Sequence, residues 1–523
     1  MAFLHKWSSL TSRNLRFAMS KRFASFGYVY DERMLQHDCE YDRTVHENPK
    51  RMSLIYERLQ KDGALEKAVK IEAREATDKE IMRNHPESLI RELEALDTND
   101  KCEEFARDKE AVYTNSKSHI AAKLAAGSSI EILKAVWEGK IHNGFAMVRP
   151  PSHHSWGKTP QGYCLFNNTA IAAKYAVEEL GVERIAVVDF DYHAGNGTYY
   201  SLKGDKRFHM TSIHAYHHGA YWPFNKEFSY ETDENTLFVP LNGTMNTEGD
   251  YLSIFHHLVL PVLKEYKPQL IIISAGMDAG YYDVLLGNGQ GVKAPGYGHM
   301  ARLLNELCPG KLVALLEGGY FPKNYTEGAS MLVRGLKGLE LPEVKLPKRL
   351  NGALLETILA NLYHHKEKYP ELQKTINQFE AQQKRLGLGP FPNRSKNLYL
   401  GAGMRQLFEA NTKAKIAKSK DWFPELTKEE VKTAVDKIDE YIAQYKFTSK
   451  HENPTSEQLI GQLVWDDASD AEVFTRSSAM VKGLIDSFND FVEGRSDSML
   501  ICDQEWYREK IKEGVIEAVK PMK

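Results

Sequence analysis

The stretch Arg184-Ile-Ala-Val-Val-Asp-Phe-Asp-Tyr-His-Ala-Gly-Asn-Gly-Thr198 decides the fold of this 523-residue chain. Its unbroken apolar run, residues 185–188, is typical of a buried parallel strand. Asp191 and His193 follow at the carboxyl end of this strand and lie on the same side, because side chains alternate along a strand. Such a pair can hold a metal ion, although a satisfied buried Asp/His pair would leave the same pattern in the sequence.

Other apolar runs also end in polar residues. They are residues 143–148 before Arg149-Pro-Pro-Ser-His-His154, 208–213 before His214, 269–273 before Ser-Ala-Gly-Met-Asp278, and 311–316 before Glu-Gly-Gly-Tyr320. Helical patterns alternate with these runs at residues 52–63, 78–96, 117–138 and 169–180. The alternation predicts a doubly wound α/β domain, with a mostly parallel sheet flanked by helices and a ligand site at the carboxyl ends of the strands. Unrelated core residues would have no reason to gather there, so the pattern favours a functional site.

Composition excludes several classes of protein. The net charge is only -3, so the chain lacks the strong positive field that tight nucleic-acid binding needs. We expect no direct sequence-specific binding to nucleic acid. The five cysteines are scattered without a CxxC spacing, which argues against a disulfide framework or a thiolate zinc site and fits a reducing compartment. No uninterrupted apolar run reaches the roughly 18 residues that span a bilayer, so we expect no membrane segment.

The two ends of the chain differ from its centre. Residues 1–25 carry Lys and Arg but no Asp or Glu, which is typical of a mitochondrial transit segment or of a basic tail. We expect a catalytic domain over 26–369 and a helical region over 370–523, where Thr427-Lys-Glu-Glu430 and Thr455-Ser-Glu-Gln458 are capping boxes. If residues 1–25 do not direct import into mitochondria, we expect the protein in the nucleus, the cytoplasm or both. The basic stretch 391–420 is interpreted as a solvated face or a contact for acidic partners.

Three residues at the strand ends are candidate metal ligands: Asp191, His193 and Asp278. Two carboxylates and one imidazole, without a thiolate, leave an open position on a zinc-type ion, as a catalytic site requires. Such an ion polarises a carbonyl group and lowers the pKa of bound water toward ~7.

The remaining polar residues supply proton transfer. His153 and His154 would stand beside the water, and an imidazole with an ordinary pKa of ~6.5 can move a proton to a leaving amine. Asp189 and Asn196 are the expected partners that orient the two rings. Tyr320 can donate its hydroxyl to a developing oxyanion. Together these groups indicate a metal-assisted amide hydrolase.

These motifs, in this order, resemble those of the zinc-dependent histone deacetylases. Gly162-Tyr-Cys-Leu-Phe-Asn-Asn168 also matches that family, and the likeness covers residues from about 26 to about 365. Asn196 and Leu316-Glu-Gly-Gly-Tyr320 point to class II, and Val29 to His37 is similar to the domain start of its class IIb members.

The resemblance implies an arginase-like α/β fold and removal of acetyl groups from lysine. Zinc would be held by Asp191, His193 and Asp278, with His154 as general base and acid and His153 as its electrostatic companion. Tyr320 would polarise the carbonyl group, and a tyrosine at this position predicts a competent enzyme. The family also places a potassium ion, mostly on backbone oxygens, near Asp189, Asp191, His193, Ser212 and Ile213. The tunnel that grips the lysine stem would be lined by Tyr163, Trp222 and Gly162.

Several residues depart from the family pattern. Ser152 replaces a glycine, Ala194 replaces a histidine and Trp222 replaces a phenylalanine, and none of the three is an expected zinc ligand. Lys117 stands where class II members often carry a serine at the rim, so Ser116 or Ser118 would substitute, or the contact would be missing. The His46–Arg51 stretch also differs, which leaves its rim loop open.

Alternative functions remain at this point. Polyamine-selective relatives carry a glutamate seven residues after the last zinc-binding aspartate, whereas this chain has Leu285, which favours protein lysine over acetylpolyamines. A non-catalytic acetyl-lysine binder with corepressor or cytoskeletal partners is a second alternative. A binuclear manganese site of the arginase type would need further ligands at the strand ends, and Phe190 and Tyr192 are not ligands.

Overall fold

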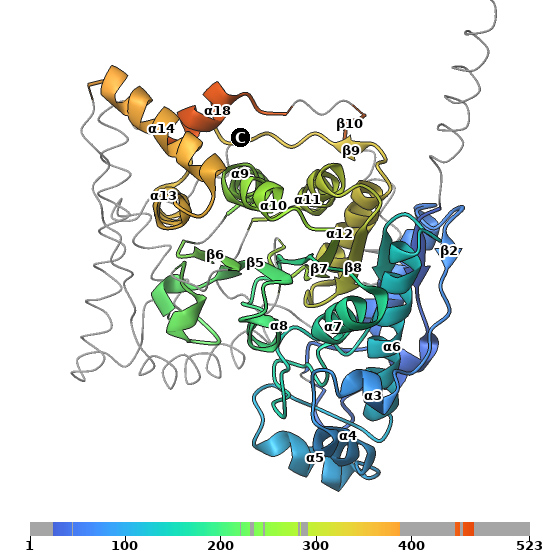
Figure 1. The fold of residues 1–523 in the computed structure, drawn as a ribbon. Coiled ribbons are helices and arrows are strands. Elements are labelled where there is room, and N and C mark those ends of the chain that lie inside the picture. The colour runs from blue at the N-terminus through green and yellow to red at the C-terminus, as the bar shows by residue number, and fades with distance from the viewer. Residues whose placement is uncertain are drawn as a thin grey trace, which may run out of the picture.

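The fold is built on one sheet of eight parallel strands, in the order β2-β1-β3-β8-β7-β4-β5-β6 (Figure 1). The computed structural model describes residues 25–43, 45–219, 221–230, 235–243, 246–280, 283, 291–387, 445–449 and 453–464. The strands are β1 (Gly27–Val29), β2 (Val69–Lys70), β3 (Gly144–Ala146), β4 (Ile185–Asp189), β5 (Phe208–Ala215), β6 (Thr236–Leu241), β7 (Leu270–Ala275) and β8 (Leu312–Leu316). The predicted α/β class is therefore confirmed.

The five apolar runs of the sequence correspond to β3, β4, β5, β7 and β8, and every residue in these strands is buried. The other three strands were not predicted, for local reasons. β1 and β2 have only three and two residues. β6 contains Pro240, and a proline argues against a strand when the sequence alone is considered. It is tolerated here because β6 is at the edge of the sheet.

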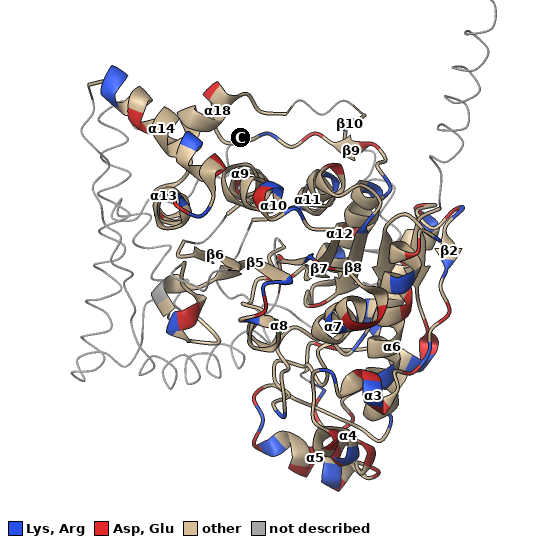
Figure 2. Cartoon of the chain, viewed as in Figure 1, with Lys and Arg blue, Asp and Glu red and all other residues tan. Residues whose placement is uncertain are grey.

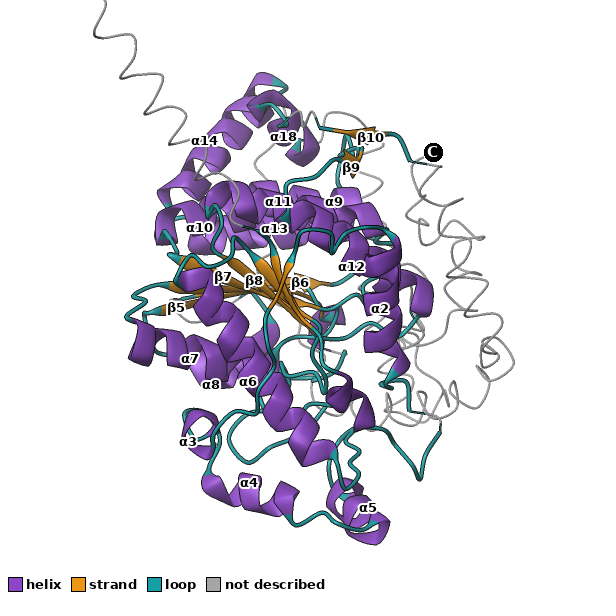
Figure 3. Cartoon of the chain, turned by 90° about the vertical axis from the view of Figure 1, so that its right-hand side faces the viewer, coloured by secondary structure: helices purple, strands orange, loops and turns teal. Residues whose placement is uncertain are grey.

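Helices cover both faces of the sheet (Figure 3). One layer contains α6 (Ser118–Trp137), α7 (Asn168–Leu180) and α8 (Asn196–Leu202). The other contains α9 (Glu248–Ile254), α10 (Leu260–Tyr266), α11 (Ala294–Leu307), α12 (Pro322–Leu336) and α13 (Gly352–His365), with the π-helical segment η4 (Phe255–Val259) between α9 and α10. Helix α2 (Lys50–Lys61) packs against α12. Short 3-10 turns are η1 (Glu32–Gln36), η2 (His217–Gly219) and η3 (Lys226–Phe228).

The predicted helix ends agree with the structure in one place and fail in another. α7 ends at Gly181, whose φ of 70° is the left-handed conformation that the glycine stop predicts. The single helix predicted over 78–96 is wrong, because Pro86 divides it into α3 (Asp78–Ile81) and α4 (Glu87–Glu94). Together with α5 (Asn99–Arg107), these helices carry interspersed charges of both signs (Figure 2).

Part of the C-terminal region packs against the sheet domain. α14 (Pro370–Arg385) and α18 (Ser456–Leu463) both contribute buried side chains to the main hydrophobic core, and β10 (Phe447–Thr448) pairs with β9 (Leu341–Pro342). The capping box at Thr455 is confirmed, since its side chain accepts a hydrogen bond from the Gln458 N–H. The box at Thr427 and the basic stretch 391–420 lie outside the described residues.

Two expectations from composition can be compared with the described part of the chain. Its four cysteines are free and buried, as the scattered spacing predicts. None of its helices combines the length and the apolar character that crossing a membrane requires.

Candidate active site

Four neighbouring strands bring the predicted site residues together. β3, β8, β7 and β4 are adjacent in the sheet, and all four run parallel. The chain leaves β3 toward His153 and His154, β4 toward Asp191 and His193, β7 toward Asp278, and β8 toward Tyr320. Since the carboxyl ends of parallel strands share one edge of a sheet, residues up to 167 positions apart in sequence meet there.

Asp191, His193 and Asp278 form a compact group of potential metal ligands. One ligand atom from each lies within 4.8 Å of the others. His193 Nδ1 is 2.8 Å from Asp278 Oδ2 and 3.3 Å from Asp191 Oδ1. Backbone N–H groups orient the carboxylates, because Tyr192 donates to Asp278 Oδ1 at 2.7 Å and Gly318 donates to Asp191 Oδ2 at 2.9 Å.

The space between these ligands suits an ion. A Cβ atom on Gly318 would lie 2.5 Å from Asp191 Oδ2, 3.0 Å from Asp278 Oδ2 and 3.3 Å from the Tyr320 hydroxyl. A Cβ on Gly276 would overlap the Asp191 carboxylate. Glycine at both positions therefore keeps the approach to the two carboxylates clear. Both carboxylates are buried, and the donor set of two oxygens and one imidazole nitrogen fits a zinc-type ion.

The histidine pair is held by the two partners named from the sequence. His153 Nδ1 is 3.0 Å from Asp189 Oδ2, and His154 Nδ1 is 2.8 Å from Asn196 Oδ1. The two ring centroids are 3.8 Å apart. The Asn196 carbonyl oxygen can only accept, so Nδ1 of His154 carries the hydrogen and Nε2 carries the lone pair in the neutral ring.

The two histidines have opposite electrostatic surroundings. Burial alone would lower the pKa of His153, but the carboxylates of Asp191 and Asp189 outweigh it and raise this pKa well above its ordinary value. Burial lowers the pKa of His154, and the neighbouring charge of His153 lowers it further. His154 is therefore neutral and able to accept a proton, while His153 is positively charged. Environments that separate two pKa values in this way identify acid and base roles.

The two aromatic residues named as substrate walls lie against the rings of His154 and Tyr320. The Trp222 ring lies edge-on to His154 with centroids 4.4 Å apart, and Tyr163 lies 5.6 Å from Tyr320. Gly162 has a φ of 56°, and a Cβ there would overlap the His154 ring, so the close approach of this backbone requires glycine. Leu285 lies outside the described residues.

The departures at 152 and 194 have clear structural outcomes. Ala194 packs away from the ligand group in a separate apolar cluster with Tyr199, Met210, Tyr216, Phe228 and Phe238. Ser152 gains a contact, since its hydroxyl donates to Glu317 Oε1 at 2.5 Å and its N–H donates to Glu317 Oε2 at 2.6 Å. Neither substitution removes a candidate ligand.

Two expectations about the rim change. The Ser118 hydroxyl is buried and bound to His37 Nδ1 at 2.7 Å, so of the two serines considered as substitutes only Ser116 keeps partial exposure. The stretch 46–51 is not only a rim loop, because Glu47 and Arg51 are buried in the interior.

Sequence reasoning missed Asp283. Its Oδ2 accepts hydrogen bonds from the N–H groups of Tyr320 at 2.7 Å and Phe321 at 3.2 Å, so it holds the turn that carries Tyr320. A lone aspartate five residues after Asp278 is not a motif, and only the contact with a segment 37 residues away shows its role.

The predicted potassium site involves residues of β4 and β5. The register of the sheet places Asp189 opposite Ser212 on β4 and β5, so these two backbones are neighbours. Potassium here stays a prediction.

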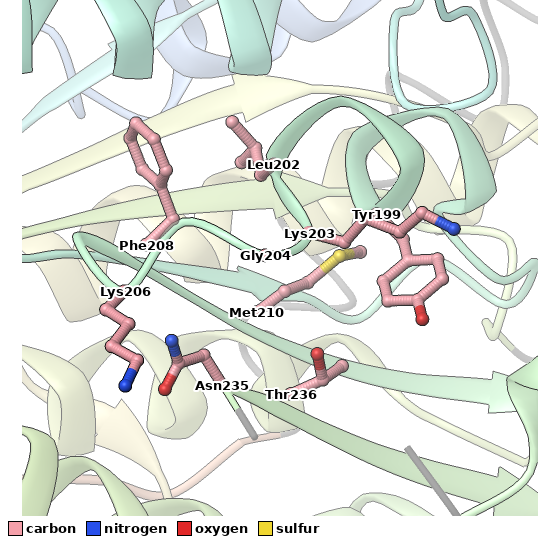
Figure 4. Close-up of a pocket in the computed structure, with 9 residues that line it drawn as sticks. All are labelled: Tyr199, Leu202, Lys203, Gly204, Lys206, Phe208, Met210, Asn235 and Thr236. Carbon is pink, nitrogen blue, oxygen red and sulfur yellow. The ribbon is translucent and has the colours of Figure 1, made fainter. Parts of the chain in front are cut away.

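A surface cavity of about 280 Å³ lies elsewhere (Figure 4). It is lined by the end of α8, by the turn between α8 and β5, and by residues at the start of β5 and β6, including Lys203, Lys206, Phe208 and Asn235. These are the amino ends of the strands, whereas the histidines and aspartates gather at the carboxyl ends, so this cavity is distinct from the candidate active site.

Comparison with known proteins identifies the family. Residues 45–336, more than half of the chain, match the family model described as "Histone deacetylase domain". Histone deacetylase 18 of Arabidopsis thaliana is 36% identical over 306 residues, which cover 56% of this chain and 45% of that protein. Polyamine deacetylase HDAC10 of Homo sapiens is 34% identical over 331 residues, which cover 61% of this chain and 48% of that protein. The match to these curated relatives spans about half of their length.

A solved structure agrees with this assignment. The crystal structure of the HDA15 HD domain superposes with a TM-score of 0.61 at 29% identity, covering 68% of this chain and 98% of that one. The resemblance found in the sequence motifs is thereby confirmed, and the arrangement of candidate ligands and histidines fits a hydrolase that cleaves amides. The chain belongs to the histone deacetylase family, and its relatives are class II members.

Proposed function

We propose that this protein is a zinc-dependent deacetylase that removes acetyl groups from lysine side chains of proteins. The observation that carries the proposal is the geometry of His153 and His154, which Asp189 and Asn196 hold at the edge of the Asp191/His193/Asp278 group. A neutral imidazole next to a metal-ligand group is the arrangement that amide hydrolysis requires.

The zinc ion would be held by the three ligands of that group and, when bound, would supply polarisation of the acetyl carbonyl and activation of water. Hydrolysis breaks the bond between the acetyl carbon and the lysine nitrogen. His154 Nε2 takes a proton from the water, whose oxygen ends on acetate, and returns a proton to the leaving amine. Burial raises the pKa of Tyr320 well above its ordinary value despite the nearby Arg51, so its hydroxyl stays protonated and donates to the oxyanion.

Protein lysine is proposed over acetylpolyamine because Leu285 offers a second amine neither charge nor a hydrogen bond. Trp222 beside His154 and Tyr163 beside Tyr320 suit the apolar lysine stem, which must leave water. A potassium ion near the Asp189 and Ser212 backbones is proposed as a structural cation.

The test is release of acetate from an acetylated histone peptide, an acetylated tubulin peptide and acetylspermidine, measured side by side. We expect turnover of the peptides, and loss of at least about 100-fold in His154→Ala and Tyr320→Phe. Faster turnover of acetylspermidine would establish the polyamine alternative, and acetyl-peptide binding without turnover would establish the non-catalytic binder.

A further inference from the structure

Glu47 lies at the centre of a buried charge cluster that the motif comparison left unexplained. Its side chain is fully buried between two arginines that are also buried. Glu47 Oε1 accepts from Arg51 Nη1 at 2.9 Å and from Arg149 Nε at 3.0 Å. Its Oε2 accepts from Arg149 Nη2 at 2.7 Å and from the Tyr113 hydroxyl. One carboxylate therefore joins three side chains from separate parts of the chain.

The first partner, Arg51, holds the turn that carries Tyr320. Arg51 Nε donates to the Gly319 carbonyl oxygen at 2.6 Å, and its Nη2 donates to the Glu317 carbonyl oxygen. The guanidinium carbon lies 4.8 Å from the centroid of the Tyr320 ring. Any movement of Arg51 is thus transmitted to both the backbone and the ring of this turn.

The second partner, Arg149, begins the loop that ends in His153 and His154. Arg149 Nη1 donates to the carbonyl oxygens of Met34, at 3.0 Å, and of His37. The start of the histidine loop is therefore fixed to the N-terminal segment through the same guanidinium that binds Glu47. The third partner, Tyr113, lies edge-on to Tyr163 with centroids 6.3 Å apart.

The charges make Glu47 indispensable to this arrangement. Burial alone would raise the pKa of Glu47, but the guanidinium groups of Arg149 and Arg51 outweigh it and hold this pKa well below its ordinary range. The neighbouring His37 is neutral, because burial and Arg149 lower its pKa to about 3. Two buried guanidinium groups without their shared carboxylate would repel each other and leave unpaired charge in the interior.

We propose that Glu47 is a positioning residue, which fixes the distance between the Tyr320 turn and the His153/His154 loop through Arg51 and Arg149. This inference rests on the proposed function for the roles of Tyr320 and His154. It assigns Glu47 no contact with the substrate. A displacement of about 1 Å between groups that must act together can reduce a rate by about 100-fold.

The test compares Glu47→Gln with Asp62→Asn. Asp62 pairs with Arg58 at 2.7 Å, with side-chain exposures of 5% and 0%, in the same i,i+4 spacing as Glu47 and Arg51. Both arginines lie on α2, with Glu47 just before this helix and Asp62 just after it. Both variants lose one charge of a buried ion pair. We expect Glu47→Gln to lower kcat about 100-fold with KM within threefold, at a temperature where thermal unfolding shows it folded, while Asp62→Asn keeps kcat within twofold.

Hydrogen exchange supplies a readout that needs no turnover. In Glu47→Gln, amide exchange should become faster in both 149–156 and 317–321, and Asp62→Asn should leave both segments unchanged. Faster exchange with an inactive wild type would support the positioning role and reject the proposed function. Unchanged exchange, or equal loss of kcat in both variants, would overturn the positioning role. If Glu47→Gln does not fold, Glu47→Asp, which keeps the charge but is too short to span both arginines, should show the same changes to a smaller degree.

Discussion

The side-chain carbonyl oxygen of Asn196 accepts a hydrogen bond from Nδ1 of His154 at 2.8 Å. This hydrogen bond favours the imidazolium, but burial and the charge of His153 outweigh it and hold the pKa of His154 well below its ordinary value. Asn196→Asp would place a negative charge there and raise this pKa. Because the base must be deprotonated, we expect the acidic limb of the pH–rate profile of kcat to move to higher pH. An unchanged profile would contradict the role of His154 as general base.

The contact between Ser152 and Glu317 predicts a loss of stability in Ser152→Ala. The Ser152 hydroxyl is buried and donates to Glu317 Oε1 at 2.5 Å, so the variant leaves that buried oxygen without this donor. We expect the free energy of unfolding to fall by about 1–3 kcal/mol. The matched control is Ser129→Ala, where an equally buried hydroxyl binds the Ala125 carbonyl oxygen within α6 at 2.8 Å. Denaturant titration should show the smaller loss in the control.

Asp283 should matter for activity more than for stability. Asp283→Ala removes the acceptor of the Tyr320 and Phe321 N–H groups, so the Tyr320 hydroxyl is no longer held in place. We expect kcat to fall by about 10- to 100-fold at unchanged metal content. Asp250→Ala is the control, because Asp250 is equally buried and caps α9 through Thr247. Similar kcat losses in both variants would show that Asp283 has no specific role.

Buried neutral histidines predict that acid destabilises the fold. Burial lowers the pKa of His257 to about 4, although Gln462 accepts from its Nε2 at 2.9 Å. Below about pH 6.5 the unfolded chain takes up a proton that the folded chain does not, so stability is complete above this pH and falls as the pH drops toward 4. Between these two pH values, this histidine lowers the free energy of unfolding by about 1.4 kcal/mol for each pH unit. The free energy of unfolding of the wild type and of His257→Gln can be measured at pH 7.5 and pH 5.5, and it should change less between them in the variant. An equal change in both proteins would refute the role of His257.

Removal of the metal should destabilise the protein. Asp191 and Asp278 are buried together, and a cation between them would relieve the repulsion of their charges. Zinc at about a thousandfold excess over its Kd should add about 4 kcal/mol to the free energy of unfolding of chelator-treated protein. Asp278→Asn should abolish most of this gain in calorimetry, since it removes one charged ligand. A gain as large as that of the wild type would place the metal elsewhere.

The sequence by itself determined the five central apolar strands, their polar ends and the candidate ligands and histidines that follow them. Runs such as 185–188 and 270–273 are apolar throughout because both faces of a parallel strand are buried, and this composition is readable without a structure. The stop at Gly181 and the cap at Thr455 are equally local, because each depends on one residue and its nearest neighbours.

Only the tertiary structure decided which distant groups meet. The order β3-β8-β7-β4 places the histidine loop beside the ligand group, and no local pattern encodes which strands pair. Arg51 reaches Gly319 across 268 residues, and Glu47 reaches Arg149 across 102. Asp283 finds Tyr320 in the same way. These contacts depend on the packing of whole elements and on burial, which makes an unpaired charge costly, so they appear only once the chain is folded.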